Sequence, residues 1–308
     1  MNAKEKALLE NQQYGLTGNH SAVKICTWTK KSLRDEAVCY KEKFYGIKSH
    51  KCCQMTPSLG ICQNLCIFCW RDQTIKGSFK HLDEPEKIIE NSVIQQRKLL
   101  SGFKGNSKVN LKKWKEAQNP NQYAISLSGE PTLYPKLSEL IKKLHSAGCT
   151  TFLVTNGLRP EVIAKLEMPT QLYVSLDAPN EKIFKMVDKP SSKNAWKKLN
   201  ETLDLIPKLN KKTRTCIRIT LIKGYNMAHA VQYAARIEKS QPRFVEVKGY
   251  MFVGSSRQRL SIENMPRHNE VKEFAEKICE HCSYKIIDEQ PISRVVLLMK
   301  EEKDRFIK

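Results

Sequence analysis

Three cysteines in one short stretch have the spacing of a metal-binding loop. Cys62, Cys66 and Cys69 follow a C-x3-C-x2-C pattern, and thiolates are soft ligands suited to iron–sulfur clusters. Three ligands for a four-iron cluster leave one iron without a protein ligand. An open position of this kind can bind a substrate or a cofactor directly. The stretch therefore predicts a catalytic cluster.

A zinc ion is the alternative occupant of the same stretch. Structural zinc normally has four protein ligands, so a zinc site here would need one more. His50, Cys52 or Cys53 could supply it. The spacing of the three cysteines favours the cluster over zinc.

A second set of cysteines precedes the first. Cys26, Cys39 and Cys52 are spaced at equal intervals along the chain. Three cysteines without an obvious fourth suggest a second cluster that also has an open iron. Zinc binding and unrelated burial of the three side chains remain the alternatives at this point.

The composition indicates an intracellular protein with a polyanionic partner. The chain has 308 residues, and 53 Lys and Arg against 32 Asp and Glu give a net charge of +21. The excess is spread along the chain, which favours nucleic acid as the partner; the alternative is a lysine-rich, solubilising surface. Eleven cysteines in such a chain indicate metal or redox use rather than disulfides.

The chain has no sequence that indicates a membrane or a secretion signal. Its first residues are polar and charged, without the apolar core of a signal peptide. No apolar run is long enough to span a bilayer. We expect a soluble, cytoplasmic protein.

Strands and helices are predicted to alternate, which indicates a parallel α/β sheet. Strands are expected at 51–56, 123–127, 151–154, 172–175, 216–221, 244–247, 284–287 and 295–298, and helices at 82–100, 133–145, 160–166, 194–206 (stopped by Pro207), 229–239 and 268–280. This number of strands favours a partial or complete (β/α) barrel over a doubly wound sheet. Residues 1–50 would form an N-terminal extension carrying most of the second cysteine set, and residues 51–308 the barrel with basic insertions.

Polar residues follow several predicted strands, and in such barrels the chemistry lies beyond the carboxyl ends of the strands. The strand at 123–127 leads into Gly129, where a ligand can approach the backbone closely, and into Glu130, which can accept hydrogen bonds. The next strand ends are marked by Thr155, Asn156, Ser175 and Asp177, and Arg218 lies on the strand at 216–221. Any one of these residues could equally serve a turn, a cap or a structural ion pair.

The order of the cysteine stretch, with the aromatic Phe68 before Cys69, resembles the signature of the radical S-adenosylmethionine (SAM) family. The segment Ser128-Gly129-Glu130 resembles the family's Gly-Gly-Glu segment, with Ser128 in place of the first glycine. The resemblance implies a [4Fe-4S] cluster whose open iron is chelated by SAM, which is split to give a 5′-deoxyadenosyl radical. It also implies a set of SAM contacts: Gly129, Glu130, Thr155, Asn156, Ser175, Asp177 and, as a partner for a carboxylate, Arg218.

A longer resemblance covers about residues 20–300. The upstream cysteines, together with Ser126–Pro135, Thr155–Gly157 and Val174–Pro179, are similar to the archaeal tRNA 4-demethylwyosine synthases of the wybutosine pathway. The resemblance implies two [4Fe-4S] clusters, a separate electron donor and a carbon–carbon lyase-type, ring-forming reaction. Its substrates would be pyruvate and N1-methylguanosine at position 37, beside the anticodon of phenylalanine tRNA.

The resemblance leaves open how pyruvate is held. An open iron on the cluster of Cys26, Cys39 and Cys52 could bind its carboxylate and carbonyl oxygens. A Schiff base with a desolvated lysine is the alternative, and the candidates are Lys41 and Lys43.

Basic loops and aromatic residues are the candidates for contact with tRNA. The basic candidates are Arg71, Lys76, Lys80, Lys104, Lys108, Lys112, Lys113, Arg257 and Arg259, and the candidates for base stacking are Trp70, Trp114 and Tyr250.

Two other functions compete with this interpretation. One is another radical SAM RNA-modifying enzyme of the methylthiotransferase type, which would be expected to carry a further C-terminal RNA-binding module. The other is a metal-stabilised tRNA-binding protein without catalysis. Such a protein would have no need of Glu130, Asn156 and Asp177 at successive strand ends.

Overall fold

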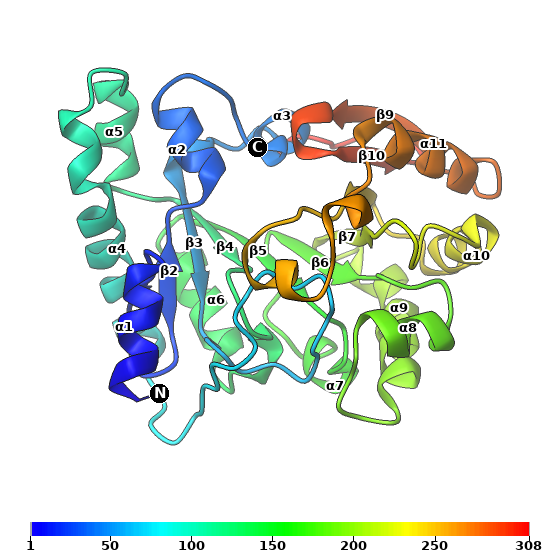
Figure 1. The fold of residues 1–308 in the computed structure, drawn as a ribbon, viewed down its shortest axis with the longest axis horizontal. Helices are drawn as coiled ribbons and strands as arrows, with labels where there is room; N and C mark the ends of the chain where they lie inside the picture. The colour runs from blue at the N-terminus through cyan, green and yellow to red at the C-terminus, as the bar shows by residue number, and fades with distance from the viewer. Residues whose placement is uncertain (1, 308) are drawn as a thin grey trace.

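The computed structural model describes residues 2–307 and contains one ten-stranded mixed sheet (Figure 1). The strands are β1 (Gly15–Leu16), β2 (Ala22–Lys24), β3 (Cys52–Thr56), β4 (Gln122–Ile125), β5 (Thr150–Thr155), β6 (Gln171–Ser175), β7 (Arg214–Leu221), β8 (Phe244–Gly249), β9 (Lys285–Gln290) and β10 (Val295–Met299). Their order is β1-β2-β3-β4-β5-β6-β7-β8-β10-β9. Strands β3 to β8 are parallel, and antiparallel pairs extend the sheet at both edges.

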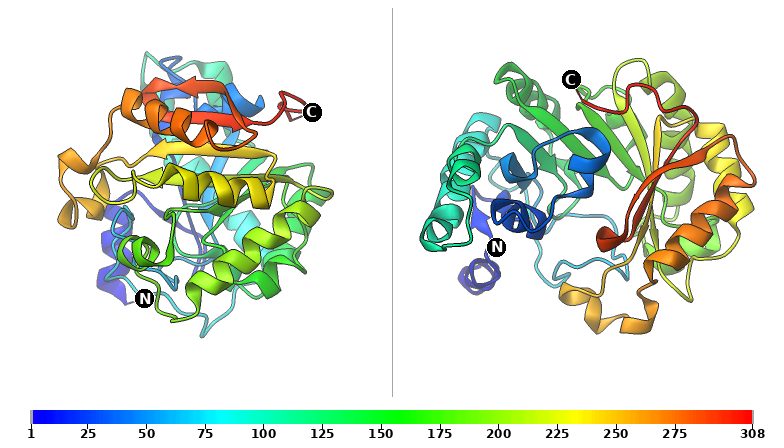
Figure 2. Two further views of the ribbon diagram at one scale, coloured as in Figure 1. Left: turned by 90° about the vertical axis from the view of Figure 1, so that its right-hand side faces the viewer. Right: turned by 90° about the horizontal axis from the view of Figure 1, so that it is seen from above.

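Helices connect the parallel strands and lie along the outside of the curved sheet (Figure 2). The helices are α1 (Ala3–Asn11), α2 (Thr27–Leu33), α3 (Tyr40–Tyr45), α4 (Pro85–Leu100), α5 (Leu111–Ala117), α6 (Leu137–Ser146), α7 (Pro160–Ile163), α8 (Glu181–Val187), α9 (Ala195–Leu209), α10 (Ala230–Ser240) and α11 (His268–Cys279). The sheet is curved but not closed, so the prediction of a partial (β/α) barrel is confirmed.

Alternate residues of the strands build two separate cores, because side chains of a strand point to opposite faces. Leu153, Val174 and Ile217 face outward and pack with the covering helices. Phe152 and Tyr173, their neighbours, face inward. The inner face is filled by α3, whose Tyr40, Phe44 and Tyr45 pack with Phe152, Tyr173 and Phe244. Helix α3 is thus held inside the partial barrel.

The eight strands expected from residue 51 onward are all present, and six of the helices lie at the predicted places. The prediction that Pro207 stops its helix is wrong: α9 continues to Leu209 with Pro207 inside its last turn. Pro207 has no N–H to donate to the carbonyl of Leu203, so the last turn of α9 forms without that hydrogen bond. The elements β1, β2, α2, α3, α5 and α8 were not predicted. They are short, and short elements carry a weak periodic signal.

The predicted division at residue 50 stays a prediction; β2, before it, pairs with β3, after it. Over residues 2–307, no helix combines the length and the apolar composition that crossing a bilayer would require.

Candidate active site

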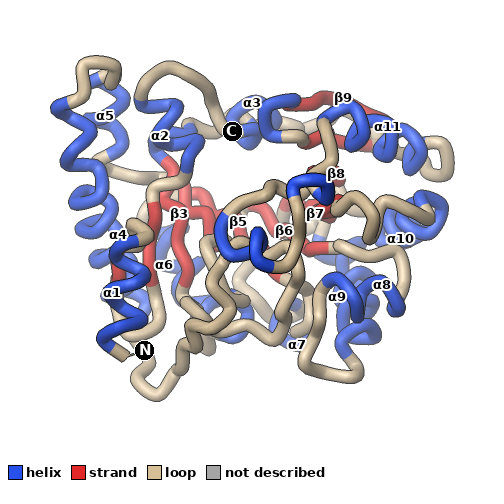
Figure 3. Tube along the Cα trace, in the orientation of Figure 1, coloured by secondary structure: helices blue, strands red, loops and turns tan. Residues whose placement is uncertain are grey.

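The long connection between β3 and α4 carries the three-cysteine motif (Figure 3). We call residues 57–84 the cysteine loop. It lies across the carboxyl ends of the parallel strands. Backbone hydrogen bonds join it to the end of α8 and to the segment that follows this helix. Leu65 N donates to the carbonyl of Lys189 at 3.1 Å, and Ile67 N donates to that of Val187 at 2.9 Å. These bonds give an irregular loop a fixed position.

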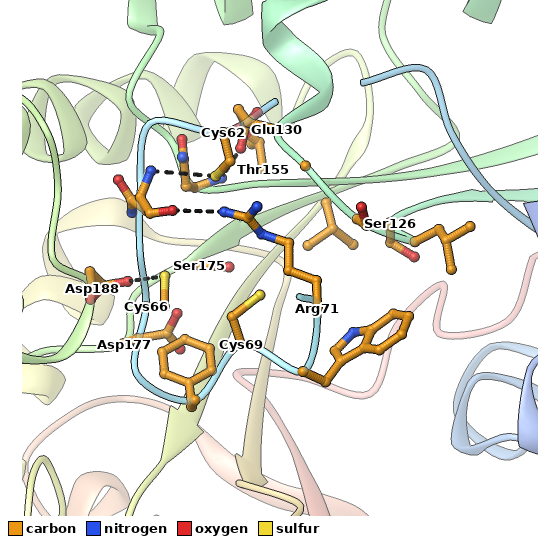
Figure 4. Close-up of a pocket in the computed structure, with 18 of the residues that line it drawn as sticks. Cys62, Cys66, Cys69, Arg71, Ser126, Glu130, Thr155, Ser175, Asp177 and Asp188 are labelled. Atoms are coloured by element: carbon orange, nitrogen blue, oxygen red, sulfur yellow. Dashed lines mark hydrogen bonds between the residues drawn. The ribbon is translucent and has the colours of Figure 1, made fainter. Parts of the chain in front are cut away.

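Cys62, Cys66 and Cys69 line one cavity beneath this loop (Figure 4). None of the three thiols is in a disulfide, and burial raises the pKa of Cys62 to about 11. Three unpaired thiols in a water-poor pocket fit a cluster that binds them as thiolates. Within residues 2–307, no three His, Cys, Asp or Glu side chains are gathered so as to hold a metal ion. The cluster assignment therefore rests on the motif and on the shared cavity.

The residues considered as a fourth zinc ligand point elsewhere. His50 Nε2 is hydrogen-bonded to Glu116 Oε2 at 2.7 Å. Cys53 is fully buried in the outer core. Cys52 lines a different cavity. This arrangement disfavours a four-ligand zinc site in the cysteine loop.

Glu130 is buried at the end of β4, where four donors surround its carboxylate. Its Oε1 accepts from the amide of Thr132 at 3.1 Å and from the hydroxyls of Thr132 and Thr155 at 2.6 and 2.7 Å. Its Oε2 accepts from Asn156 N at 2.8 Å. Burial raises the pKa of Glu130, and these donors oppose that effect. The carboxylate is fixed at the cavity wall, with lone pairs left for a cationic or hydroxyl donor.

The other predicted strand-end residues line the same cavity: Gly129, Thr155, Asn156, Ser175, Asp177 and Arg218. The structure therefore brings together every residue expected to contact SAM. Asp177 accepts a hydrogen bond from Thr220 N at 2.7 Å, and burial raises its pKa to about 6, opposed by Arg218. Thr155 has a supporting position, because its hydroxyl donates to Glu130 and accepts from Gly157 N at 3.1 Å.

Two further residues of this cavity escaped the sequence analysis. Asp188 lies against the cysteine loop, with Oδ1 3.5 Å from the Sγ atom of Cys66 and Oδ2 buried without a partner. The side-chain oxygen and nitrogen of Asn64 are likewise buried and unpartnered. Both residues line the cavity. Asp188 follows a helix rather than a strand, so no strand-end pattern marked it.

The upstream cysteines meet in a second cavity of about 340 Å³. Cys26 precedes α2, Cys39 precedes α3 and Cys52 begins β3. All three line the cavity and none is in a disulfide. Burial, together with the nearby Cys26, raises the pKa of Cys39 to about 12. The three cysteines that are equally spaced along the sequence therefore lie together in the fold.

The two lysines predicted to bind pyruvate, Lys41 and Lys43, lie in different places in the structure. Lys41 lines the second cavity and is 8 % exposed; its Nζ lies 4.9 and 4.8 Å from the ring centres of Phe152 and Tyr173. Lys43 does not line it. It forms an ion pair with Asp288 at 2.8 Å, so the expectation that placed Lys43 at this site is corrected. The reason is helical geometry: Lys41 and Lys43 are two positions apart in α3, and residues at that spacing do not share a face of a helix.

Lys248, which was not predicted, is a second lysine of this cavity. Its Nζ donates to the carbonyl of Ser293 at 2.7 Å. Burial, reinforced by the charge of Arg218, lowers the pKa of Lys248 to about 8.

The two cavities share a wall. Phe68, Trp70, Ser126 and Arg218 line both of them. The cavity of the cysteine loop and the cavity of the upstream cysteines are therefore neighbouring compartments rather than distant sites.

Several residues expected to contact RNA form contacts with other parts of the protein instead. Arg71 is 6 % exposed and donates to the carbonyl of Asn64 at 2.9 Å. Trp114 donates from Nε1 to the carbonyl of Leu100 at 2.9 Å. Tyr250 is 2 % exposed, and Trp70 stacks on Tyr14 with ring centres 6.2 Å apart. Arg71 and Tyr250 are therefore poorly placed to contact RNA, whereas Trp70 and Trp114 are half-buried.

The other basic candidates divide by exposure. Arg259 binds carbonyl oxygens of the cysteine loop, and Lys113 is paired with Asp35 at 2.6 Å. The exposed candidates are Lys76, Lys80, Lys104, Lys108, Lys112 and Arg257.

The fold and the site define a radical SAM enzyme. Residues 56–237 match the family model described as "Radical SAM superfamily", which covers the cysteine loop and the strand ends from β4 to β7. Residues 239–300 match a second model, "Wyosine base formation".

Full-length relatives specify the family further. The chain is 48 % identical over 305 residues to the S-adenosyl-L-methionine-dependent tRNA 4-demethylwyosine synthase of Pyrococcus abyssi, covering 96 % of this chain and 89 % of that protein. It is 43 % identical over 304 residues to the enzyme of that name from Methanocaldococcus jannaschii, covering 96 % of both. This chain belongs to the family of S-adenosyl-L-methionine-dependent tRNA 4-demethylwyosine synthases.

Solved structures agree with this assignment. "Structure of TYW1 with a lysine-pyruvate adduct bound" is similar with a TM-score of 0.88 and 41 % identity, covering 100 % of this chain and 98 % of that chain. "Crystal structure of archaeal TYW1" is similar with a TM-score of 0.81 and 36 % identity, covering 100 % of both. The family implies SAM, a [4Fe-4S] cluster and a tRNA substrate; the methylthiotransferase and non-catalytic interpretations are set aside.

Gly129 offers a test of how tightly the cysteine loop packs on the sheet. It has φ +73°, and a Cβ there would lie 1.8 Å from the carbonyl oxygen of Ser58. Gly148 has φ +72° with nothing within 4 Å of the same position. Gly148→Ala should cost about 1–2 kcal/mol for the left-handed backbone, and Gly129→Ala about 1–3 kcal/mol more for the clash. Urea denaturation of the two metal-free variants measures this; equal losses would contradict the close packing.

Proposed function

We propose that this protein condenses N1-methylguanosine at position 37 of phenylalanine tRNA with two carbons of pyruvate, forming the tricyclic base 4-demethylwyosine. The observation that carries the proposal is the pair of adjoining cavities. One contains the three-cysteine motif and the strand-end residues, the other three further cysteines and Lys41. Two adjoining cavities suit a reaction that joins two substrates.

The first cavity is proposed to hold the [4Fe-4S] cluster on Cys62, Cys66 and Cys69, and SAM beside it. When bound, these groups supply a 5′-deoxyadenosyl radical that takes a hydrogen atom from the N1-methyl group. The chain's own residues orient the cofactor. Glu130, fixed by four donors, would accept a hydrogen bond from the SAM ammonium group.

The remaining contacts of this cavity are also proposals. Thr155 holds Glu130, while Asn156, Ser175 and Asp177 present amide, hydroxyl and carboxyl groups to the ribose and methionine parts. Arg218, in the wall between the cavities, offers a planar guanidinium to a carboxylate. Gly129 admits the ligand close to the backbone.

The second cavity is proposed to hold pyruvate. Cys26, Cys39 and Cys52 would bind a second [4Fe-4S] cluster, which fits three half-buried, unpaired thiols that line one space. Lys41 would form the Schiff base: it is buried and lies in the same space. A solved relative was described with a lysine–pyruvate adduct, which supports a lysine rather than iron alone as the pyruvate site.

The tRNA is proposed to approach over the open edge of the barrel. The chain's charge of +21 favours RNA, and Lys104, Lys108 and Lys112 are exposed around α5. Electrons for the first cluster would come from a separate donor, and we place the reaction in the cytoplasm.

The two cysteine sets should respond differently to substitution. Cys66→Ala removes a ligand of the first cluster and should abolish cleavage of SAM with dithionite as the reductant. Cys39→Ala should leave SAM cleavage measurable but stop the entry of labelled pyruvate carbons into tRNA. Chromatography of 5′-deoxyadenosine and of labelled nucleosides gives both readouts. Retained cleavage in Cys66→Ala would refute the first assignment, and retained labelling in Cys39→Ala the second.

Lys41 should be the residue that traps pyruvate. Incubation of the protein with pyruvate and cyanoborohydride, followed by peptide mass spectrometry, should give a reduced adduct on Lys41. The adduct should be lost in Lys41→Ala and kept in Lys43→Ala, whose side chain is paired with Asp288 outside the cavity. An adduct on Lys248 would show that the less basic lysine of the cavity is the pyruvate site instead.

The exposed lysines around α5 should contribute to the salt dependence of tRNA binding. Replacing Lys104, Lys108 or Lys112 with Gln should each weaken binding and reduce the slope of log K against log salt by about one for every phosphate that is no longer neutralised. Lys211→Gln is the control, because Lys211 is exposed next to the amino end of β7, four strands away in the sheet from β3, whereas α5 packs on the segment that leads into β3. Unchanged slopes in all three variants would remove α5 from the RNA interface.

A further inference from the structure

The connection between β8 and α11 is tied to the cysteine loop. We call residues 250–266 the strap; in Figures 1 and 2 it is the orange segment beside the blue-to-cyan cysteine loop. Both of its ends are anchored to the end of β7. Tyr250 N donates to the carbonyl of Leu221 at 2.8 Å, and Lys223 N donates to that of Asn264 at 2.9 Å. The strap is therefore fixed to the sheet independently of the loop it touches.

Arg259 joins the strap to the cysteine loop at the cluster motif itself. Its Nε donates to the carbonyl of Ile67 at 3.1 Å, and its Nη2 donates to the carbonyl of Cys69. One planar guanidinium thus holds two carbonyls on either side of Phe68. Hydrogen bonds from a charged donor are roughly twice as strong as neutral ones, so this contact is a firm constraint on a loop without regular structure.

Gly254 brings the two backbones into direct contact. Ser255 N donates to the carbonyl of Trp70 at 3.0 Å. A Cβ on Gly254 would lie 2.3 Å from that same oxygen, so only glycine permits the approach. Beneath these bonds, Tyr250 and Leu260 pack with Ile67 in one buried apolar cluster. Polar and apolar contacts therefore fix the same interface.

The interface also forms the boundary between the two cavities. Phe68 and Trp70 of the cysteine loop line both cavities, while Tyr250, Met251 and Val253 of the strap line the second. A shift of the loop away from the strap would change the first cavity and the shared wall together.

We propose that Arg259 is a positioning residue, which fixes the cysteine loop against the strap and so aligns the first cavity with the second. The proposal deepens the proposed function and rests on it only for the coupling of the two half-reactions. Arg259 lines neither cavity; it acts through the carbonyls of Ile67 and Cys69.

The first test uses the metal-free protein and does not depend on catalysis. In Arg259→Gln, alkylation of Cys62, Cys66 and Cys69 by iodoacetamide, followed by peptide mass spectrometry, should be about tenfold faster than in the wild type. That change corresponds to about 1.4 kcal/mol of lost restraint. Cys149 and Cys282 of the same molecule, which are partly exposed and line neither cavity, are the internal reference and should react at unchanged rates.

The matched control is Arg257→Gln. Arg257 is an exposed arginine of the same strap, and its guanidinium lies 5.9 Å from the ring centre of Phe252. It should leave the alkylation rates of the motif cysteines unchanged. Gly254→Ala, which attacks the same interface from the backbone, should raise them as Arg259→Gln does.

The second test measures coupling in the reconstituted enzyme. At saturating tRNA and pyruvate, Arg259→Gln should release several times more 5′-deoxyadenosine per modified tRNA than the wild type. Alkylation rates equal to those of the wild type would overturn the proposal, and so would unchanged coupling.

If every cysteine of Arg259→Gln, including the buried Cys216, reacts faster, the variant is unfolded and Arg259→Lys replaces it. Selective exposure of the motif cysteines in Arg259→Lys supports the proposal, and its absence overturns it. Failure of wild-type product formation would instead refute the proposed function.

Discussion

The backbone of the cysteine loop lies directly on the backbone at the end of β4, and the first cavity depends on that contact. Glu130 N donates to the carbonyl of Ile61 at 2.7 Å, while Gly129 leaves no room for a side chain beside Ser58. The same short turn therefore positions the Glu130 carboxylate and the start of the cysteine motif. A displacement of either one would move the other, which couples the expected ligand of SAM to the expected ligands of the cluster.

Burial then determines the electrostatics of this cavity. Glu130, Asp177 and Asp188 are all buried, and burial raises the pKa of each carboxyl group. A site that desolvates three carboxyl groups beside two guanidinium groups, those of Arg71 and Arg218, is better suited to a ligand with positive charge than to an anion. SAM carries a sulfonium, so its binding would offset part of the cost of burying these groups.

The sequence predicted the parts of the structure that rest on local patterns. The C-x3-C-x2-C motif and the residues after each parallel strand could be assigned because parallel strands bring their carboxyl ends to one edge. The strap contact of Arg259 could not be found this way, because its partners are backbone carbonyls almost two hundred residues away. Asp188 and Lys248 were missed for a related reason: only the tertiary fold turns their side chains into cavities.

The two cavities differ in how much of the fold each requires. The cysteines of the first belong to one loop, whereas those of the second come from the starts of α2, α3 and β3, and its other wall comes from β7, β8 and the strap. Helix α3 keeps its place through Tyr40, Phe44 and Tyr45 in the inner core. These anchors lie beside Lys41 in sequence, so packing of the inner core places its ammonium group over Phe152 and Tyr173. The geometry of the second cavity is therefore a consequence of the completed inner core, and damage to that core should affect the proposed pyruvate half of the reaction before the SAM half.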